Sequence, residues 1–226
     1  MIRMWFPDGS ELRAARGISL REAAMTIHPD LADRAVCASV DGELRDLRDT
    51  LAEDCQLTLH TDATPEGARV AGHTAAHIVA QAVKRLFPSA ILGLDPTANG
   101  FFSCDVEFGR SLTEDDLQRI QEEVDRIVTE DLPIEREILS KGDARALLIR
   151  RGEVLKLEIL ERIGSPTVTV YRHGEFVDLC RGPHLASTGR LPEIRLTAVG
   201  EASWRNDPNA EALSRISGAV VPSRPA

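Results

Sequence analysis

The chain has 226 residues, of which 42% are hydrophobic and 28% are charged, a balance typical of a soluble globular protein with one large or two smaller domains. Its apolar runs fall short of the roughly 18 residues needed to span a bilayer, and no signal peptide is recognisable. The sequence therefore predicts a cytoplasmic protein that does not enter a membrane. A net charge of -9 argues against capture of nucleic acid by a broad basic surface, so any RNA contact should be local.

Residues 1–62 predict a small sheet wrapped over one helix. The extended run 2–6 and its return at 11–14 flank turn residues, and Ser19 can cap a helix with Glu22 as its capping-box partner. This order is typical of a ubiquitin-like β-grasp domain. Further strands are expected at 35–40, 43–47 and 56–60. The cysteines and histidines of this unit are interpreted as ordinary core or surface residues: Cys37, Cys55, His28 and His60.

Residues 63–226 predict a larger α+β domain with a sheet and packed helices. A linker containing Pro and Gly at 61–67 leads into an amphipathic helix over 68–87, and Thr113 caps a second long helix. A shorter helix is expected at 143–149. The other regular segments are expected to be strands at 134–139, 154–160, 168–173, 176–178 and 194–199, with a loop or strand over 91–106 and a frayed tail from residue 220.

Two pairs of chemically active residues stand out in this second domain. His73 and His77 are four residues apart in the first helix, and Cys180 and His184 have the same spacing, so each pair shares one face if its segment is helical. Imidazole and thiolate together suit a tetrahedral zinc, and four protein ligands would make a closed, structural site. Without metal, the same groups are general bases and hydrogen-bond donors around a polar cavity. The spacing alone leaves both interpretations open.

Several common catalytic motifs are missing from the sequence. HExxH does not occur, which removes the usual zinc-protease reading, and neither do GxSxG, the P-loop or GxGxxG. The four cysteines are scattered without a CxxC pair, which favours reduced thiols over disulfides.

The run from Phe176 to His184, Phe-Val-Asp-Leu-Cys-Arg-Gly-Pro-His, resembles the DLCRGPH signature of the editing domain of threonyl-tRNA synthetases, with His73-x-x-x-His77 as its upstream partner. The editing domains of alanyl-tRNA synthetases share the two pairs in a looser form. The first sixty residues are similar to the ubiquitin-like TGS domain that precedes the editing domain in the bacterial-type enzyme. Further similar segments extend the resemblance over essentially the whole chain: 99–102, 112–116, 151–156 and 202–207.

The resemblance implies hydrolysis of a misacylated tRNA, Ser-tRNA(Thr), at the ester that joins serine to the terminal adenosine. A synthetic site built for threonine cannot strongly reject serine, because one methyl group is worth only about 1 to 3 kcal/mol, whereas a second site can exclude threonine by a clash. The chain would thus be an aminoacyl-tRNA deacylase. No cofactor is expected to be required, and zinc at the two residue pairs is an option.

The matched motifs also imply roles for single residues. His73 would hold the terminal ribose hydroxyl, Lys156 and His184 would position or activate water, and Asp178 would orient the substrate amino group or the water. The residues expected to shape the pocket or bind substrate are His77, Cys180, Phe101 and Arg181. Because phosphates need cations, a groove for tRNA is expected to include some of four arginines: Arg150, Arg151, Arg172 and Arg181.

Two features depart from the family pattern. Ser103 and Cys104 stand between the Phe101-Phe102 pair and Asp105, where the family places an aromatic pair directly before the aspartate. The chain also ends soon after residues 214–218, where a full synthetase would enter its aminoacylation domain, and it lacks the class II motifs. The sequence therefore predicts a fragment or a freestanding editor. Its expected partners are the tRNA(Thr) acceptor end carrying serine and either the remaining synthetase domains or a separate synthetase.

A function of a different class is also open. In this alternative the chain is a noncatalytic RNA-binding or regulatory module, in which the TGS-like unit binds a partner and the four-residue cluster holds a structural zinc. Metal content measured together with serine release would separate the two hypotheses.

Overall fold

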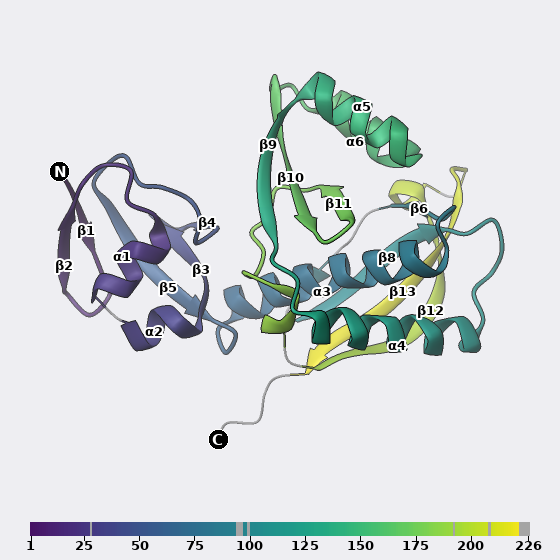
Figure 1. Ribbon diagram of the computed structural model, residues 1–226, viewed down its shortest axis with the longest axis horizontal. Coiled ribbons are helices and arrows are strands. Elements are labelled where there is room, and N and C mark those ends of the chain that lie inside the picture. Colours follow the sequence, from purple (N-terminus) through teal and green to yellow (C-terminus); the bar gives the residue numbers. More distant parts are fainter. Residues whose placement is uncertain (28, 94–96, 99, 192, 208, 222–226) are drawn as a thin grey trace.

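The computed structural model describes residues 1–27, 29–93, 97–98, 100–191, 193–207 and 209–221. These residues form a mixed α+β structure, which confirms the predicted fold class (Figure 1). A five-stranded sheet built from the first 61 residues lies at one end, and two further sheets with longer helices make up the rest. The interpretation of His28 lies outside the described residues.

The N-terminal sheet has the strand order β2-β1-β5-β3-β4, in which β1 and β5 are parallel and the other neighbours are antiparallel. Helix α1 begins where the sequence predicts, because the Ser19 amide donates to the Glu22 carboxylate at 2.8 Å and the Glu22 amide donates to the Ser19 hydroxyl at 3.2 Å. Cys37, Cys55 and His60 are buried, as interpreted. The elements are β1 (Ile2–Trp5), β2 (Glu11–Ala14), α1 (Leu20–Ile27), α2 (Pro29–Arg34), β3 (Ala35–Val40), β4 (Glu43–Arg45) and β5 (Cys55–Thr61).

The largest core lies between an antiparallel sheet and two long helices. The sheet has the order β12-β13-β8-β6, with β7 paired to β8, and helix α3 packs on β8, β13 and α4 (Figure 1). Thr113 caps α4 through a capping box with Asp116, as the sequence predicts for its start. The elements are α3 (Pro65–Leu86), β6 (Ile91–Leu92), β7 (Thr97–Ala98), β8 (Phe101–Glu107), α4 (Glu114–Glu130), β12 (Glu193–Ser203) and β13 (Ala212–Val221).

A three-stranded antiparallel sheet, β11-β10-β9, carries a pair of helices. Helices α5 and α6 pack on each other and close a small core of their own with this sheet, which includes Leu148, Leu160 and Val168. The elements are β9 (Glu135–Ser140), α5 (Lys141–Arg151), α6 (Val154–Arg162), β10 (Thr167–His173) and β11 (Phe176–Leu179). Single turns of 3₁₀ helix occur at Thr188–Arg190 and Trp204–Asn206.

The strand predicted at 154–160 is wrong, because this segment is helix α6. Its alternating apolar residues imitate a strand, yet Leu, Lys and Glu are good helix formers, and the buried positions Leu155, Lys156 and Leu160 follow helical spacing. Gly152 ends α5 with a left-handed φ of 72°, which lets the next helix begin at once. Lys156 therefore projects from a helix and not from a strand.

Two smaller expectations are also corrected. The linker predicted at 61–67 is shorter, because β5 continues to Thr61 and Thr64 already caps α3 by accepting a hydrogen bond from the Gly67 amide. Residues 220 and 221 belong to β13, where they pair with β12, and the rest of the tail lies outside the described residues. The extra residues Ser103 and Cys104 fit a regular strand, because β8 pairs with β13 without a register shift. Among the described residues, no helix is long and apolar enough to cross a bilayer.

Candidate active site

Helix α3 supplies the two histidines of the HxxxH pair. Thr64 and Pro65 fix its start, and an almost unbroken run of buried residues from Val70 to Val83, many of them alanines, packs it in the main core. At Gly72 an added Cβ would lie 3.4 Å from the backbone oxygen of Phe101, so the start of β8 runs directly beside the HxxxH segment. His77 is 2% exposed, whereas His73 remains partly accessible.

Cys180 and His184 come from the loop that follows β11, and this segment is not helical. The helical geometry considered for this pair is therefore wrong, and a compact loop brings the two side chains together instead. The loop turns at Gly182, whose φ of +73° favours glycine and whose added Cβ would lie 2.1 Å from the Tyr171 hydroxyl. The amide of Gly182 then donates to the Cys180 sulfur at 3.3 Å.

The two pairs meet at one point. The Cys180 sulfur lies 3.2 Å from Nε2 of His73 and 3.3 Å from Nε2 of His184. The ring centroids of His73 and His77 are each within 4.3 Å of that of His184, at 4.2 and 4.3 Å. The sequence prediction that these four side chains converge is thus matched by the geometry.

Thr74 fixes the orientation of His184. Its hydroxyl donates to the Val70 carbonyl at 3.0 Å and accepts from the Leu185 amide at 3.2 Å, so its 3.2 Å contact with Nδ1 of His184 requires that this nitrogen carry the proton. The lone pair of His184 is therefore on Nε2, which faces Cys180. Sequence reasoning missed Thr74, although its position between His73 and His77 placed it on the same helix.

Burial keeps the imidazoles neutral at pH 7. Desolvation lowers the pKa of His73 to about 4, partly opposed by a hydrogen bond with the Pro183 backbone. Burial also lowers the pKa of His77 and of His184 well below its usual value. Neutral imidazoles offer a lone pair to a metal or to a hydrogen-bond donor, so the cluster is suited to metal ligation and to holding a water or a hydroxyl, and the lowered pKa values make each ring a weak base.

Lys156 and Asp178 form a buried ion pair next to the cluster. The Lys156 ammonium donates to Oδ2 of Asp178 at 2.8 Å, and the Leu179 amide donates to Oδ1 at 2.7 Å. Both charges act on His73: the ammonium lowers its pKa and the carboxylate raises it. The four residues with expected catalytic roles, His73, Lys156, Asp178 and His184, are thereby brought into one electrostatically coupled centre.

Phe101 and the four arginines expected to contact tRNA lie at or near the surface. Phe101 is 65% exposed at the start of β8, and Arg181 is exposed on the loop after Cys180. Arg151 and Arg172 are close enough that the Arg172 charge lowers the pKa of Arg151, after the larger effect of burial. Arg151 also donates to the Glu175 carbonyl at 2.6 Å, so these two arginines form part of a charged surface near β10 and β11. Arg150 is exposed at the end of α5.

The donor set fits a zinc ion. One ligand atom from each of His73, His77, Cys180 and His184 lies within 4.8 Å of all the others. The two sulfur-to-nitrogen distances are near the roughly 3.5 Å edge of a tetrahedron built with usual zinc bond lengths. Thr74 would support His184 from outside, but Nδ1 of His77 is buried without a partner in the described part of the chain. The cluster is compatible with zinc.

Comparison with known proteins identifies the class of domains. Residues 2–61 match the TGS domain, and residues 168–217 match the threonyl and alanyl tRNA synthetase second additional domain. The chain thus carries a TGS domain followed by a domain of the synthetase editing type, which confirms both parts of the resemblance.

Curated relatives specify the family further. The chain is 44% identical over 221 residues to the threonine–tRNA ligase of Thermotoga maritima and 42% identical over 218 residues to threonine–tRNA ligase 2 of Bacillus subtilis. It is 40% identical over 219 residues to the threonine–tRNA ligase of Halorhodospira halophila. Each match covers 96% of this chain and 34% of the relative. The chain is homologous to the N-terminal region of threonyl-tRNA synthetases and spans about a third of their length.

Proposed function

We propose that this chain hydrolyses Ser-tRNA(Thr), releasing serine and free tRNA. The observation that carries the proposal is the single centre formed by the His/Cys cluster and the Lys156–Asp178 pair, in a chain homologous to synthetases with an editing-type domain. In the proposed reaction a water oxygen bonds to the ester carbonyl carbon, the bond from that carbon to the ribose oxygen breaks, and the ribose oxygen takes up a proton. Aminoacyl esters are reactive, so positioning of the water contributes much of the rate.

Accessibility supports the proposed roles of His73 and Cys180, and the roles of the buried residues are those that the matched motifs imply. His73 and Cys180 are the partly exposed members of the cluster, so they form the wall that a ribose or a serine side chain can reach. His73 holds the ribose hydroxyl, and His77 and Cys180 shape the pocket. Lys156 and His184 position or activate the water, and Asp178 orients the substrate amino group or the water. Phe101 and Arg181 contribute exposed contacts at the rim.

The proposed function also implies a domain boundary, partners and a compartment. We place the division between the TGS domain and the editing domain at residues 62 and 63, within the short connection between β5 and α3. The partners are the acceptor end of tRNA(Thr), reached with help from Arg151 and Arg172, and the other domains of a synthetase or a separate synthetase. Because charged tRNA is used in translation, the cytoplasm is the proposed compartment.

The decisive experiment measures amino acid release. Ser-tRNA(Thr) and Thr-tRNA(Thr) are incubated with the chain, with and without a chelator, and we expect serine to be released much faster than threonine in both conditions. His73→Ala and Lys156→Ala should each abolish most of this activity, whereas His60→Ala, which removes a buried histidine of the TGS domain, should keep it. Equal rates for wild type, His73→Ala and Lys156→Ala would refute the assigned roles.

A noncatalytic module with a structural zinc is the second candidate function. The observation that favours it is the convergence of four zinc-type ligand atoms within 4.8 Å. One equivalent of tightly bound zinc without serine release would establish this alternative, and serine release from the metal-free protein would exclude it.

A further inference from the structure

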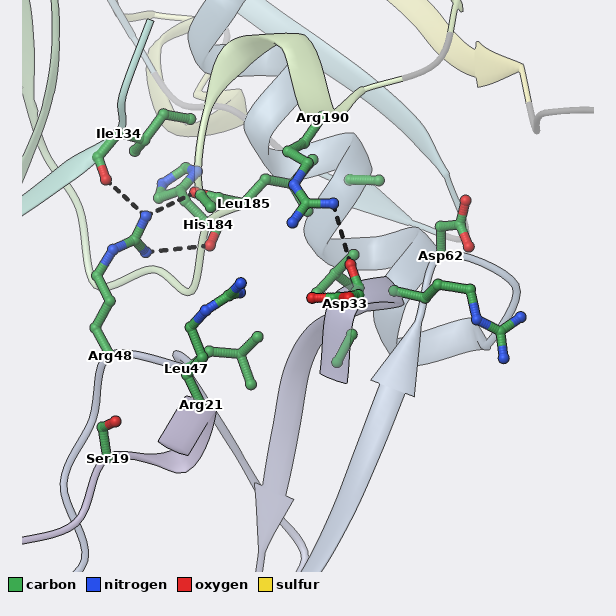
Figure 2. Close-up of a pocket in the computed structure, with 15 residues that line it drawn as sticks. Ser19, Arg21, Asp33, Leu47, Arg48, Asp62, Ile134, His184, Leu185 and Arg190 are labelled. Atoms are coloured by element: carbon green, nitrogen blue, oxygen red, sulfur yellow. Dashed lines mark hydrogen bonds between the residues drawn. The ribbon is translucent and has the colours of Figure 1, made fainter. Parts of the chain in front are cut away.

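Arg48 of the TGS domain reaches across to the loop that carries Cys180 and His184. Its Nη1 donates to the His184 carbonyl at 3.4 Å, and its Nη2 donates to the carbonyls of Leu185 and Ile134 at 2.9 and 2.6 Å. Figure 2 shows the guanidinium extended toward these three backbone oxygens. Arg48 of the TGS domain therefore provides hydrogen bonds to two carbonyls of the loop from Cys180 to Leu185. Backbone carbonyls need such partners when they are removed from water.

Asp46 holds Arg48 in place and contacts the same loop. Both carboxylate oxygens accept from Nη1 of Arg48, at 2.9 and 2.8 Å. Oδ2 also accepts from the Tyr171 hydroxyl at 3.1 Å and from the His184 amide at 3.4 Å. Asp46 is 3% exposed and Tyr171 is fully buried, so the bonds of Asp46 to Tyr171 and to the His184 amide lie inside the protein, where they are stronger than in water.

His184 is consequently held from two sides. Thr74 of α3 fixes its ring through Nδ1. Asp46 accepts a hydrogen bond from its backbone amide, and Arg48 donates one to its carbonyl. The Tyr171 ring packs edge-on against the imidazole, with centroids 4.5 Å apart. These contacts account for the polar groups of His184 except Nε2, which points to Cys180.

We propose that Asp46 and Arg48 are positioning residues of the editing site. The TGS domain then contributes directly to editing, because these two residues hold the loop from Cys180 to Leu185 in the position that hydrolysis requires. Neither residue touches the reacting atoms, and both act through His184. This inference rests on the proposed deacylase function for its kinetic readout, but the contacts themselves can be tested without activity.

The kinetic test uses Arg48→Ala in the full chain. Without the guanidinium, the carbonyls of His184 and Leu185 lose their partner, and the loop shifts to regain hydrogen bonds. Because a shift of about 1 Å can cost up to about a hundredfold in rate, we expect kcat for Ser-tRNA(Thr) to fall about 10- to 100-fold, with KM changed less than about threefold. Arg48→Lys should recover part of kcat, since a lysine can reach a carbonyl but cannot form the planar fork.

Asp49→Ala is the matched control. Asp49 lies in the same turn of the TGS domain and forms an ion pair with Arg136 of β9, so it crosses the same junction. Within the described residues its side chain pairs with Arg136 and Arg45 and does not hydrogen-bond to the loop from Cys180 to Leu185. We expect kcat within about twofold of wild type for this variant. Unfolding temperatures of both variants show whether they lose similar stability. Equal kcat losses in Arg48→Ala and Asp49→Ala would overturn the proposal.

A readout without activity separates this inference from the proposed function. The rate at which iodoacetamide alkylates Cys180 is measured by mass spectrometry, with the buried Cys37, Cys55 and Cys104 as internal references. Arg48→Ala should raise the rate at least about threefold and Asp49→Ala should not, because only the first frees the loop. If the wild type shows no deacylation, the proposed function fails while this measurement still decides the coupling.

A milder variant covers the case in which Arg48→Ala does not fold. Tyr171→Phe removes the 3.1 Å hydrogen bond to Asp46 and keeps the ring against His184. It should lower kcat and raise the alkylation rate of Cys180 in the same directions, by smaller factors. No change in either quantity would overturn the proposal.

Discussion

The ammonium of Lys156 donates a hydrogen bond to the carboxylate of Asp178 at 2.8 Å, and the two side chains are only 5% and 2% exposed. The partners come from different elements, helix α6 and strand β11. Each of these buried charges has lost its hydration and is stabilised by the other. The pair therefore links helix α6, which packs on α5, to the strand that leads into Cys180. Its removal should affect stability and activity together.

Lys156→Met leaves the Asp178 carboxylate buried without its cation. We expect a loss of about 3 to 5 kcal/mol in the free energy of unfolding, measured by urea denaturation, and loss of deacylation of Ser-tRNA(Thr). Arg145→Ala is the control, because it breaks an ion pair with Glu161 in which both side chains are at least half exposed. That change should cost less than about 1 kcal/mol. Similar losses in the two variants would contradict the importance of burial.

Acid should destabilise the protein through its buried histidines. Burial lowers the pKa of His73 and of His173 to about 4, whereas the unfolded value is about 6.5. Between these values the unfolded chain binds more protons, so the free energy of unfolding falls as the pH falls from about 6.5 to 4. The stability that depends on keeping these two histidines neutral is fully present above about pH 6.5. It is lost as the pH falls, and the loss levels off below about pH 4.

His173→Gln tests this pH dependence. His173 hydrogen-bonds to Gln81, and its ring centroid lies 6.4 Å from that of His77, but it is not one of the four candidate ligands. Its replacement therefore removes one titrating group and keeps those ligands. The slope of the unfolding free energy against pH should decrease by up to about 1.4 kcal/mol per pH unit between pH 6 and 4.5. Urea unfolding at several pH values measures it. An unchanged slope would mean that His173 is not buried in its neutral form.

Metal binding should depend on Cys180 and should not be needed for hydrolysis. We expect at most one equivalent of zinc, lost in Cys180→Ala and kept in Cys37→Ala, since Cys37 is a buried residue of β3 and is not one of the four candidate ligands. Atomic absorption after dialysis measures the content. A chelator should leave the deacylation rate unchanged, because the neutral histidines and Lys156 remain in place. A rate that disappears with the chelator and returns with zinc would reverse this view.

The sequence predicts the elements best where local signals are strong. Ser19 with Glu22 and Thr113 with Asp116 mark helix starts by capping chemistry that acts within three residues, and both starts are confirmed. Residues 154–160 show the opposite case, since an alternating pattern there is overridden by helix-forming residues and by packing against α5. The prediction of a frayed tail is wrong at residues 220 and 221, because these residues pair with residues of β12 that precede them by more than twenty positions in the sequence.

The candidate site divides in the same way. The two residue pairs were visible as spacing, and the convergence of His73 with Cys180 follows. Lys156 and Asp178 became visible only through resemblance to a family, because a lysine on an apparent strand has no local signal for burial. Asp46, Arg48 and Thr74 carry no motif, and their contacts with the loop after Cys180 arise only when separate elements pack together.

The glycine of the Cys180 loop should be irreplaceable for a reason that differs from backbone strain. Gly182 and Gly152 have nearly the same φ, +73° and +72°, so an alanine at either position pays a similar conformational cost of about 1 to 2 kcal/mol. At Gly152 an added Cβ would meet nothing within 4 Å, whereas at Gly182 it would lie 2.1 Å from the Tyr171 hydroxyl. Tyr171 is fully buried and bonded to Asp46, so it cannot easily move away.

Gly182→Ala should therefore lower the free energy of unfolding by clearly more than Gly152→Ala, and the difference measures the clash with Tyr171. It should also abolish serine release, since the displaced loop carries Cys180 and His184, while Gly152→Ala should retain most of the activity. Adding Tyr171→Ala to Gly182→Ala removes the clashing ring and should cost less than the sum of the two single changes. Additive losses would mean that Gly182 is required for its φ alone.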